Sequence, residues 1–382
     1  MKKLVLMIAF IMFFCGCSNK KSIVLLKKSI EYGDILYEKD LIEIKGGKLI
    51  NPDNLVNIKH LGNNKIIVKY KNNNSDKIKK YQFNLDVTDK TKPVIISSKT
   101  YYLNKGEDDD LTKYIFCGDN YDRNIKCNVE GFYDIDKLGE YNLFFTATDT
   151  KNNTTKRPFK LVVKEKTNSS YDNEEYDYNS FIKDYKDENN LLGIDVSTWQ
   201  GDIDWEKVKS SGVSFAFIRI GFGFSDDGEN VLDNKYLKNI KEAKEAGVKV
   251  GVYFYSYATS IDEVVDQANW VLKTLDNEKL DLPVAFDFEE WSSFDDYELN
   301  IYDVNLFALK FLDIIKENGY EGILYGSANY LNDVFYIKKY PYWLAHYTTK
   351  TDFSKPYKVW QVASNGIVSG IDGYVDLDIL YE

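Results

Sequence analysis

Histidine is almost absent from this chain of 382 residues, and positive charge is in deficit. The two histidines, His60 and His346, stand alone and form no paired motif of the kind that holds a catalytic zinc ion. Lysine and arginine number 49 against 60 aspartate and glutamate residues, which gives a formal net charge of −11. Because no basic surface dominates, nucleic acid is not an expected partner. No motif for a metal or an organic cofactor stands out, and we expect neither.

The apolar run at the N-terminus is too short to span a bilayer as a helix. Residues 4–14 follow a pair of lysines, a pattern typical of a secretory signal. Gly16 and Cys17 resemble the processing site of bacterial lipoproteins. We therefore predict a lipoprotein signal peptide over residues 1–16, a lipid anchor on Cys17 and a location on the extracellular face of the cell membrane. An ordinary cleaved signal and a short uncleaved anchor are the alternatives.

Cysteine is also scarce, since four occur and two of them lie within the first 17 residues. The remaining pair is Cys117 and Cys127. An even pair in a secreted chain can form a disulfide, and two ordinary buried thiols are the alternative. The sequence leaves both interpretations open.

Short β-type runs fill residues 22–165, separated by clusters of Asn, Asp, Gly and Lys. Several alternate apolar and polar residues, which is typical of strands with one buried face. The stretch divides into two similar halves, and Pro93 opens the second. This arrangement resembles the tandem immunoglobulin-like modules of bacterial surface proteins. We predict two small all-β sandwich domains, over residues 17–90 and 91–165, with surfaces that suit other proteins of the cell envelope.

Residues 166–190 are polar and acidic and show no clear periodicity. Such a composition is typical of a connecting segment. We predict an acidic linker here, with a separate catalytic domain over residues 191–382.

From Leu191 onward, apolar strands alternate with amphipathic helical stretches. A series of such units predicts an α/β domain with parallel strands. We count about eight strands and five helices, the last three strands being nearly bare of helices. Eight strands favour a closed, irregular TIM-like barrel. An open, doubly wound sheet requires a phosphate-binding glycine turn after its first strand, and GIDVSTWQG does not provide one.

Acidic residues gather at the predicted strand ends, where a barrel carries its chemistry. Asp195 belongs to the first strand, and Asp376 and Asp378 belong to the eighth. Asp287 and Glu289 are two positions apart at the end of the fourth, so a strand directs both to the same face. Phe286 and Phe288 are then expected on the opposite face, against the helices. Carboxylates gathered in this way raise one another's pKa, which suits a catalytic acid.

The motifs of this half resemble glycoside hydrolase family 25, the Chalaropsis-type lysozymes. They are GIDVSTWQGDIDW, FIRIGFG, GVYFYSY, AFDFEE, YWLAHY and VWQVASNGIVSGIDGYVDLDILY, in the order of the family. The resemblance covers about residues 191–382. It implies an irregular barrel of eight strands with five helices. It also implies cleavage of the β-1,4 bond between N-acetylmuramic acid and N-acetylglucosamine in peptidoglycan, whose glycan strands would be the partner.

The same resemblance assigns roles to four acidic residues. Glu289 is implied as the general acid, and Asp287 as the group that orients the substrate's acetamido group. Asp195 and Asp376 are implied to shape the electrostatic field and to hold Glu289 or water. Retention of stereochemistry with help from the acetamido group is also implied, whereas sequence alone leaves retention and inversion open. The chitinase-type signature D-x-x-D-x-D-x-E is missing, because Leu282 and Ala285 precede Asp287.

Aromatic side chains in the barrel are candidates for stacking against sugar rings. The substrate-binding candidates are Tyr253, Tyr255, Trp343, Tyr347 and Trp360, together with Asp378. Aromatic residues in barrel strands also form cores, which is the alternative for each of them. Arg219 is expected to pair either with a carboxylate of the barrel or in a purely structural salt bridge.

The sequence therefore supports two alternative functions. The first is a lipid-anchored muramidase at the cell surface. The second is a catalytically inactive wall-binding or scaffold lipoprotein that has kept the barrel, against which the complete acidic set argues.

Overall fold

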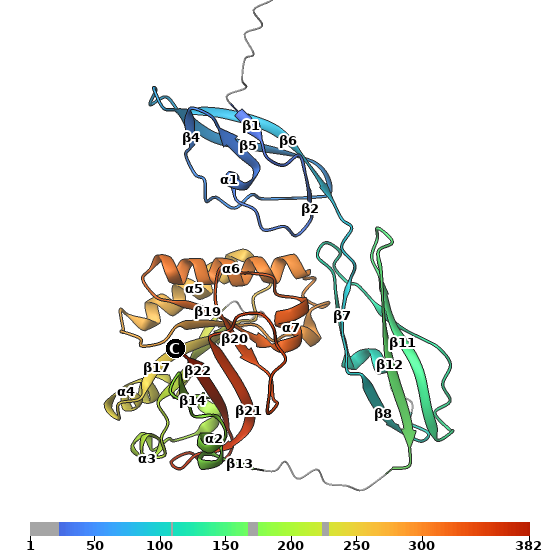
Figure 1. Ribbon diagram of the computed structural model, residues 1–382, viewed down its shortest axis with the longest axis vertical. Coiled ribbons are helices and arrows are strands. Elements are labelled where there is room, and N and C mark those ends of the chain that lie inside the picture. Colours follow the sequence, from blue (N-terminus) through green and yellow to red (C-terminus); the bar gives the residue numbers. More distant parts are fainter. Residues whose placement is uncertain (1–22, 108–109, 167–174, 224–228) are drawn as a thin grey trace, which may run out of the picture. The chain divides into compact units, whose positions relative to one another are not determined.

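The computed structural model describes residues 23–107, 110–166, 175–223 and 229–382, and the chain divides into two compact units (Figure 1). The first unit ends at Asp89, and the second spans Lys90–Glu382. The predicted signal peptide and Cys17 lie outside the described residues. Within the described ranges, no helix combines the length and the apolar composition needed to cross a membrane.

The first unit is built mainly from short strands and one long hairpin. Its elements are β1 (Ile23–Leu25), β2 (Ser29–Glu31), α1 (Glu38–Leu41), β3 (Ile42–Ile44), β4 (Gly47–Leu49), β5 (Gly62–Asn72) and β6 (Lys79–Thr88). Strand β1 pairs with β3, and a four-stranded sheet has the order β2-β6-β5-β4. In the β5–β6 hairpin Ile66 lies opposite Phe83, and both are buried while their strand neighbours are exposed. The predicted alternation is confirmed here.

The second unit begins with another β domain. Its strands are β7 (Val94–Ile96), β8 (Thr100–Asn104), β9 (Phe116–Gly118), β10 (Cys127–Glu130), β11 (Gly139–Thr148) and β12 (Thr154–Lys164). A four-stranded sheet has the order β10-β11-β12-β8, and β7 pairs with β9. The rings of Phe145 and Phe159 stack at 3.9 Å between centroids in its core. The immunoglobulin-like character of both β domains stays a prediction.

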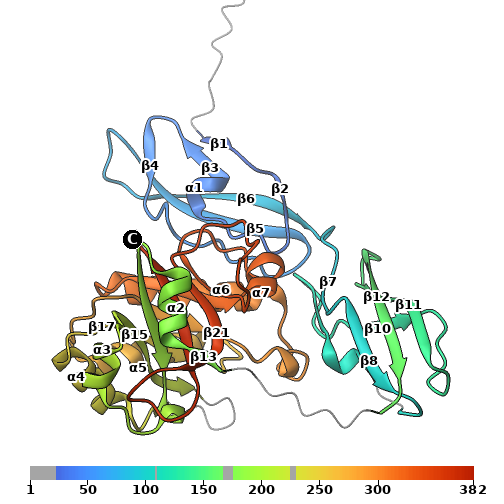
Figure 2. The same ribbon diagram turned by 60° about the horizontal axis from the view of Figure 1, so that its bottom comes forward.

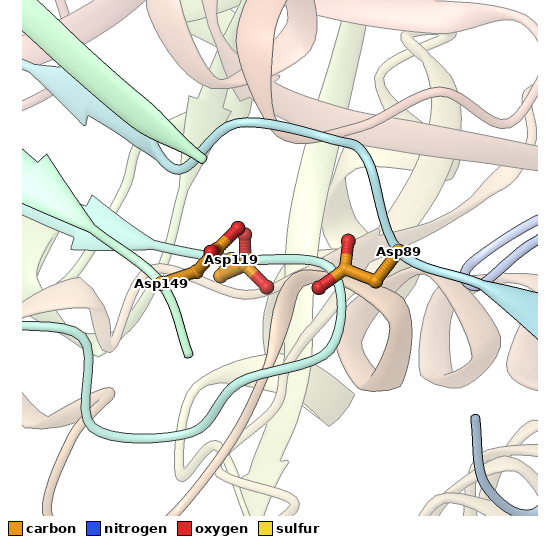
Figure 3. Close-up of side chains that lie close together, drawn as sticks. All are labelled: Asp89, Asp119 and Asp149. Carbon is orange, nitrogen blue, oxygen red and sulfur yellow. The ribbon is translucent and has the colours of Figure 1, made fainter. Parts of the chain in front are cut away.

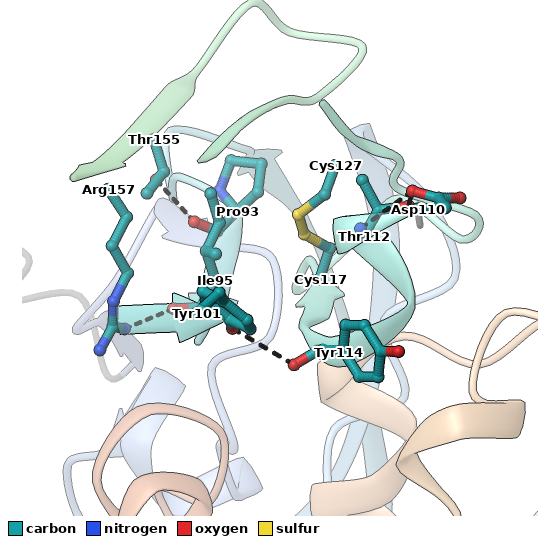
Figure 4. Close-up of a disulfide and its surroundings, with 10 residues drawn as sticks. All are labelled: Pro93, Ile95, Tyr101, Asp110, Thr112, Tyr114, Cys117, Cys127, Thr155 and Arg157. Carbon is teal, nitrogen blue, oxygen red and sulfur yellow. Dashed lines mark hydrogen bonds between the residues drawn. A yellow bond between two sulfur atoms is a disulfide. The ribbon is translucent and has the colours of Figure 1, made fainter. Parts of the chain in front are cut away.

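A disulfide joins Cys117 and Cys127 and thereby links β9 to β10 (Figure 4). The bridged interpretation of this pair therefore describes the structure. The bond connects strands of two different sheets, because β9 pairs with β7 and β10 pairs with β11. It lies close to the hydrogen bond between the Tyr101 hydroxyl and the Tyr114 carbonyl (3.4 Å).

The linker prediction is wrong from Tyr176 onward. Strand β13 (Tyr176–Asp177) pairs with a strand of the barrel, and α2 (Tyr178–Tyr185) follows it directly (Figure 2). Asp177 caps this helix by accepting a hydrogen bond from the Ser180 N–H. Phe181 is completely buried, and burial of this ring explains why an acidic, weakly periodic segment is ordered. The catalytic domain therefore begins about fifteen residues earlier than predicted.

Eight strands close into a barrel, as the sequence predicts (Figure 1). They are β14 (Asn190–Val196), β15 (Phe215–Gly223), β17 (Lys249–Tyr255), β18 (Val284–Asp287), β19 (Gly322–Ser327), β20 (Tyr342–Ala345), β21 (Val359–Ile367) and β22 (Val375–Tyr381). The first seven run parallel to their neighbours, and β22 is antiparallel to both β21 and β14. A short connection without a helix suffices between β21 and β22 because they are antiparallel. The short strand β16 (Asn230–Leu232) pairs with β15 outside this ring.

Five helices lie between the barrel strands in the described part of residues 190–382. They are α3 (Trp205–Ser210), α4 (Tyr236–Glu245), α5 (Ile261–Leu275), α6 (Ile301–Glu317) and α7 (Ala328–Asp333). Asn300 and Asp303 form a capping box that starts α6. Gly247 and Gly319 follow α4 and α6 with positive φ angles of 78° and 90°, a conformation that glycine adopts without strain.

Candidate active site

Most of the predicted acidic residues line one cavity of about 260 Å³ at the end of the barrel. Its lining residues are Asp195, Ser197, Trp199, Gln200, Arg219, Tyr253, Tyr255, Asp287, Glu289, Tyr325, Trp343, Tyr347, Gln361 and Asp376. The barrel strands explain this grouping. Asp195 and Asp287 stand at the carboxyl ends of β14 and β18, and Asp376 stands at the start of the antiparallel β22. An antiparallel strand begins where its parallel neighbours end, so all three reach the same edge.

The strand alternation around Asp287 is as predicted. Phe286 and Phe288 are buried on the opposite face, and Phe286 packs against Phe311 of α6 with ring centroids 5.1 Å apart. Asp287 itself is 4% exposed, whereas Glu289 is exposed at the cavity. Glu289 follows the last residue of β18 by two positions, so its side chain extends beyond the sheet while that of Asp287 stays within it.

Asp195 is held by a hydrogen-bond network. It lies directly opposite Asp376 in the β14–β22 pair. Opposite residues in an antiparallel pair have Cβ atoms about 5 Å apart, so the two carboxyl groups are neighbours. The Gln361 amide donates from Nε2 to Asp195 Oδ2 at 2.7 Å. The Oε1 atom of Gln361 accepts the hydroxyls of Tyr325 (2.9 Å) and Tyr347 (3.0 Å). The network therefore connects β14, β19 and β21 behind the acidic residues.

Asp378 does not line the cavity, so its prediction as a substrate-binding residue is wrong. It is completely buried and accepts a hydrogen bond from Trp343 Nε1 at 2.8 Å. Side chains two positions apart share a face of the strand, so Asp378 stands behind Asp376 and deeper in the barrel. Its charge acts on Asp195, because Coulombic repulsion from Asp378 is the second cause, after burial, that raises the pKa of Asp195.

Burial and mutual repulsion raise the pKa of all the barrel acids named above. Burial is the largest cause for Asp195 and Asp287, whose pKa values lie well above the ordinary range. The pKa of Asp376 rises to about 8, because of burial and then because of the charge of Asp195. The pKa of Glu289 is also raised, first because the surrounding protein desolvates its carboxyl and then because of the charge of Glu290. At neutral pH the cavity therefore holds protons that ordinary carboxylates would have lost.

Arg219 brings a positive charge to the cavity. Its Nε atom donates to Asp233 Oδ2 at 2.8 Å, and both side chains are largely buried. Asp233 Oδ2 also accepts the Thr198 N–H at 3.0 Å. The sequence left two partners open for Arg219, and the structure selects a carboxylate outside the predicted acidic set. The Arg219 charge still lowers the pKa of Asp287 against the larger raising effects.

Four of the five predicted aromatic candidates line the cavity, and Trp360 does not. Trp360 is 5% exposed, and its Nε1 donates to the His346 carbonyl at 2.9 Å. Its ring packs edge-on against Tyr185 of α2, so the prediction that Trp360 binds sugar is wrong. The ring belongs instead to the core that anchors the α2 segment. Trp199, at the mouth of the cavity, is 81% exposed.

Sequence reasoning missed Gln361 and Tyr325. Gln361 stands in the apolar strand VWQVA and is 3% exposed. A polar side chain at an inward position of an otherwise apolar strand is the signal that could have found it, since buried polar groups need partners. Tyr325 carried no comparable signal, because aromatic residues are common in such strands.

Asp119 and Asp149 of the second β domain are candidate cation ligands outside the barrel (Figure 3). Asp119 and Asp149 are buried, and the figure draws them with Asp89, the last residue of the first unit. Asp119 Oδ2 accepts the N–H groups of Tyr121 and Asp122, both at 2.9 Å. These bonds hold the turn of its own loop. Calcium takes about six to eight oxygen ligands, so we assign no metal to these two residues.

Comparison with known proteins identifies the barrel. The sequence profile of the glycosyl hydrolases family 25 matches residues 194–371. The uncharacterized protein YegX of Escherichia coli K12 is 33% identical over 199 residues, which cover 50% of this chain and 69% of that protein. The autolytic lysozyme of Clostridium acetobutylicum is 30% identical over 193 residues, covering 49% of this chain and 55% of that enzyme.

A solved structure of a family 25 glycosyl hydrolase from Bacillus anthracis is also similar. It has 22% sequence identity and a TM-score of 0.46, and the match covers 56% of this chain and 95% of that one. The resemblance carried by the sequence motifs is thus confirmed by the profile and by the relatives. Through its C-terminal half, this chain belongs to glycosyl hydrolase family 25.

Proposed function

We propose that this chain is a lipid-anchored muramidase of the cell surface, with Glu289 as its general acid. As a family 25 member the barrel is a glycoside hydrolase, and its lysozyme relatives support peptidoglycan as the substrate. The proposed reaction is hydrolysis of the β-1,4 bond between N-acetylmuramic acid and N-acetylglucosamine. The observation that carries the proposal is the gathering of Asp195, Asp287, Glu289 and Asp376 around one cavity.

Glu289 suits the role of the acid. Its carboxyl is exposed at the cavity, where a substrate can reach it, and its raised pKa keeps it protonated at higher pH than an ordinary glutamate. In the first step its proton passes to the glycosidic oxygen as the C–O bond breaks. In the second step the Glu289 carboxylate takes a proton from the attacking water.

Asp287 suits the role of a partner for the substrate's acetamido group. Its Oδ1 atom is buried and has no hydrogen-bond partner among the described residues. A buried acceptor without a partner is costly, and an acetamido N–H of the substrate would satisfy it. The acetamido oxygen would then bond to the anomeric carbon, and the negative charge of Asp287 would stabilise the positively charged intermediate. Such a course retains the stereochemistry of the anomeric carbon.

Asp195 and Asp376 act on the field rather than on the reacting bond in this proposal. The negative charge of Asp195 raises the pKa of Asp376 and also that of Asp287. Whichever of these groups is protonated can donate a hydrogen bond to its ionised neighbour. The exposed ring of Trp199 and the ring of Tyr347, which is 57% exposed, offer faces for sugar stacking at the mouth of the cavity.

The anchoring part of the proposal rests on the N-terminal sequence. Basic and apolar residues are followed by Gly16 and Cys17, which is the order of a lipoprotein signal. A lipid on Cys17 would hold the enzyme on the outer face of the membrane, next to the wall. The β domains would then extend the barrel toward the glycan strands and offer surfaces to other envelope proteins.

A digest of purified peptidoglycan tests the activity. The chain without its signal peptide is compared with Glu289→Gln and with Glu317→Gln, an exposed position at the end of α6. Borohydride-reduced products are read by mass spectrometry. We expect muramitol-ended fragments from the wild type and from Glu317→Gln, and none from Glu289→Gln.

Two other outcomes would contradict parts of the proposal. Fragments that persist in Glu289→Gln would remove Glu289 from the role of the acid and leave the activity standing. If the wild type releases no fragments from several wall types and still binds them, the barrel is an inactive wall-binding or scaffold domain. Anchoring is tested separately, because Cys17→Ser should release the protein from membranes into the medium.

A further inference from the structure

The second β domain contacts the barrel beside Glu289. Phe116 of β9 is 5% exposed, and its ring lies against three aromatic rings of the barrel. The centroid distances are 5.3 Å to Trp291, 5.0 Å to Phe294 and 5.6 Å to Tyr330, all in edge-to-face arrangements. Edge-to-face pairs of this kind stabilise a contact beyond simple burial. The second β domain therefore places a ring inside the barrel's own aromatic cluster.

One of the three rings that Phe116 contacts, that of Trp291, is tied to the proposed catalytic acid. Trp291 follows Glu289 by two residues, and its backbone N–H donates to the Glu289 carbonyl at 2.8 Å. The Trp291 ring stacks on Tyr330 with centroids 4.0 Å apart and planes inclined by 10°. It also meets Phe288, which immediately precedes Glu289, edge-on at 5.2 Å. The position of Trp291 thus sets the backbone on both sides of Glu289.

Polar contacts hold the far end of the same segment. The Ile301 N–H donates to the Asp119 carbonyl at 2.7 Å, and Asn300 Nδ2 donates to the Tyr121 carbonyl at 3.0 Å. Arg123 pairs with Asp303 at 2.6 Å. The residues from Trp291 to Asp303 are therefore held at both ends by the second β domain.

The β-domain side of this contact is itself rigid. Asp119 accepts the N–H of Asp122 at 2.9 Å, and the Asp122 carboxylate accepts both the N–H and the hydroxyl of Thr150. Cys117, next to Phe116, is fixed to β10 by the disulfide (Figure 4). Glycine at position 118 leaves room for the Phe116 ring, because a Cβ there would lie 2.6 Å from Phe116 Cζ and also 3.3 Å from Ile301 Cγ1 of α6.

We propose that Phe116 is a positioning residue for Glu289, so that the second β domain is part of the catalytic unit. This inference rests on the proposed function, since it concerns the proposed acid. A general acid transfers its proton efficiently only when it is held within hydrogen-bond reach of the leaving oxygen. Phe116 packs against Trp291 and fixes its position, and the N–H of Trp291 in turn binds the backbone carbonyl of Glu289. Without the Phe116 ring, Trp291, Phe294 and Tyr330 lose an aromatic contact, and the segment that follows β18 becomes more mobile.

The test compares Phe116→Ala with Phe132→Ala in the chain without its signal peptide. Phe132 belongs to the same domain and is 84% exposed, so it is a matched control for the loss of a phenylalanine ring. Steady-state rates are measured on soluble glycan fragments at a temperature at which circular dichroism shows every variant folded. For Phe116→Ala we expect kcat to fall by about tenfold to a hundredfold, with KM within about twofold. Phe116→Leu should recover most of the rate, and Phe132→Ala should match the wild type.

Hydrogen–deuterium exchange separates this proposal from the activity itself. The segment 289–300 should exchange faster in Phe116→Ala than in the wild type, and at the wild-type rate in Phe132→Ala. If the wild type proves inactive, the proposed function fails, and the exchange result still judges whether Phe116 holds the segment.

Wild-type kcat together with wild-type exchange in a folded Phe116→Ala would overturn the proposal. A rise in KM alone would also overturn it, because that result assigns Phe116 to substrate binding. If Phe116→Ala does not fold, Arg123→Ala applies the same test at the other end of the segment. There, faster exchange with a lower kcat supports the proposal, and no change in either contradicts it.

Discussion

Gln361 presents its amide N–H to Asp195 and its carbonyl oxygen to two tyrosine hydroxyls. Its Nε2 atom lies 2.7 Å from Asp195 Oδ2, while its Oε1 atom accepts the hydroxyls of Tyr325 and Tyr347. A flipped amide would place an oxygen against Asp195 and two N–H groups against two hydroxyls that now donate. The tyrosines therefore orient the glutamine, and the glutamine supports the ionised form of Asp195.

Replacing Gln361 should weaken both activity and stability. Gln361→Leu removes three hydrogen bonds and leaves the buried Asp195 oxygen and the Tyr325 hydroxyl without a partner. We expect a loss of about 1–3 kcal/mol in the free energy of unfolding, measured by urea denaturation, and a lower kcat. Tyr347→Phe is the control, because it removes one of these bonds at an exposed ring. A Gln361→Leu variant as stable and as active as Tyr347→Phe would contradict this account of the network.

Two tryptophans should respond to alanine in opposite ways. Trp199 is 81% exposed at the cavity, so Trp199→Ala should raise KM for soluble glycan and leave the melting temperature unchanged. Trp360 is buried against Tyr185, so Trp360→Ala should lower the free energy of unfolding by about 3–5 kcal/mol. Calorimetry and steady-state kinetics on both variants check this. A folded, stable Trp360→Ala with a raised KM would restore Trp360 as a sugar-binding residue.

The pH dependence of the rate should depend on Glu290. The general acid must be protonated, so kcat should fall as the pH rises through the raised pKa of Glu289. The charge of Glu290 contributes to that rise, and Glu290→Gln removes it. The alkaline limb of the pH–kcat profile should therefore move to lower pH in Glu290→Gln, while Glu317→Gln keeps the wild-type profile. A limb that stays in place would show that Glu290 does not act on the group that titrates.

The stability of the barrel should fall between pH 4 and pH 8. Burial raises the pKa of Asp378 from its ordinary value of 3.8 to about 8 in the folded chain, so the folded state binds the extra proton in this interval. The stabilisation from this group is complete below the unfolded pKa and disappears as the pH rises through the folded one. One such group changes the free energy of unfolding by about 1.4 kcal/mol per pH unit.

Asp378→Asn removes that titration and keeps an oxygen for Trp343 Nε1. Urea unfolding at several pH values should therefore give a smaller loss of stability with rising pH in the variant than in the wild type. Equal slopes for the two proteins would mean that Asp378 is ionised throughout the interval.

Loss of the disulfide should destabilise the second β domain. Cys117 and Cys127 are ten positions apart, and closing a loop of this size stabilises a fold by about 2–3 kcal/mol in the chain-entropy model. Cys117→Ala with Cys127→Ala should lower the free energy of unfolding by that amount in urea. Dithiothreitol should destabilise the wild type similarly and leave the double variant unaffected. A wild type that ignores the reductant would contradict a stabilising bridge.

Much of the barrel was predictable because its signals are local. Alternating strands and amphipathic helices follow from residue periodicity, and they predict eight strands and five helices. The acids of the cavity were predictable for the same reason, since the edge at which a strand ends places its last residues. The α2 segment was not predictable in this way. Its order comes from burial of Phe181 and pairing with β21, which are contacts distant in sequence.

The amino-acid sequence by itself determined the family, the acidic set and the order of the elements, because each of these is written in short motifs. Only the tertiary structure decided which groups meet. It directed Asp378 and Trp360 inward, brought Gln361 to Asp195, and placed Phe116 beside Trp291. These contacts join residues that lie 35 to 175 positions apart, from Trp343 and Asp378 to Phe116 and Trp291. Side-chain partners at that separation depend on how the barrel closes and how the domains pack, which no local pattern records.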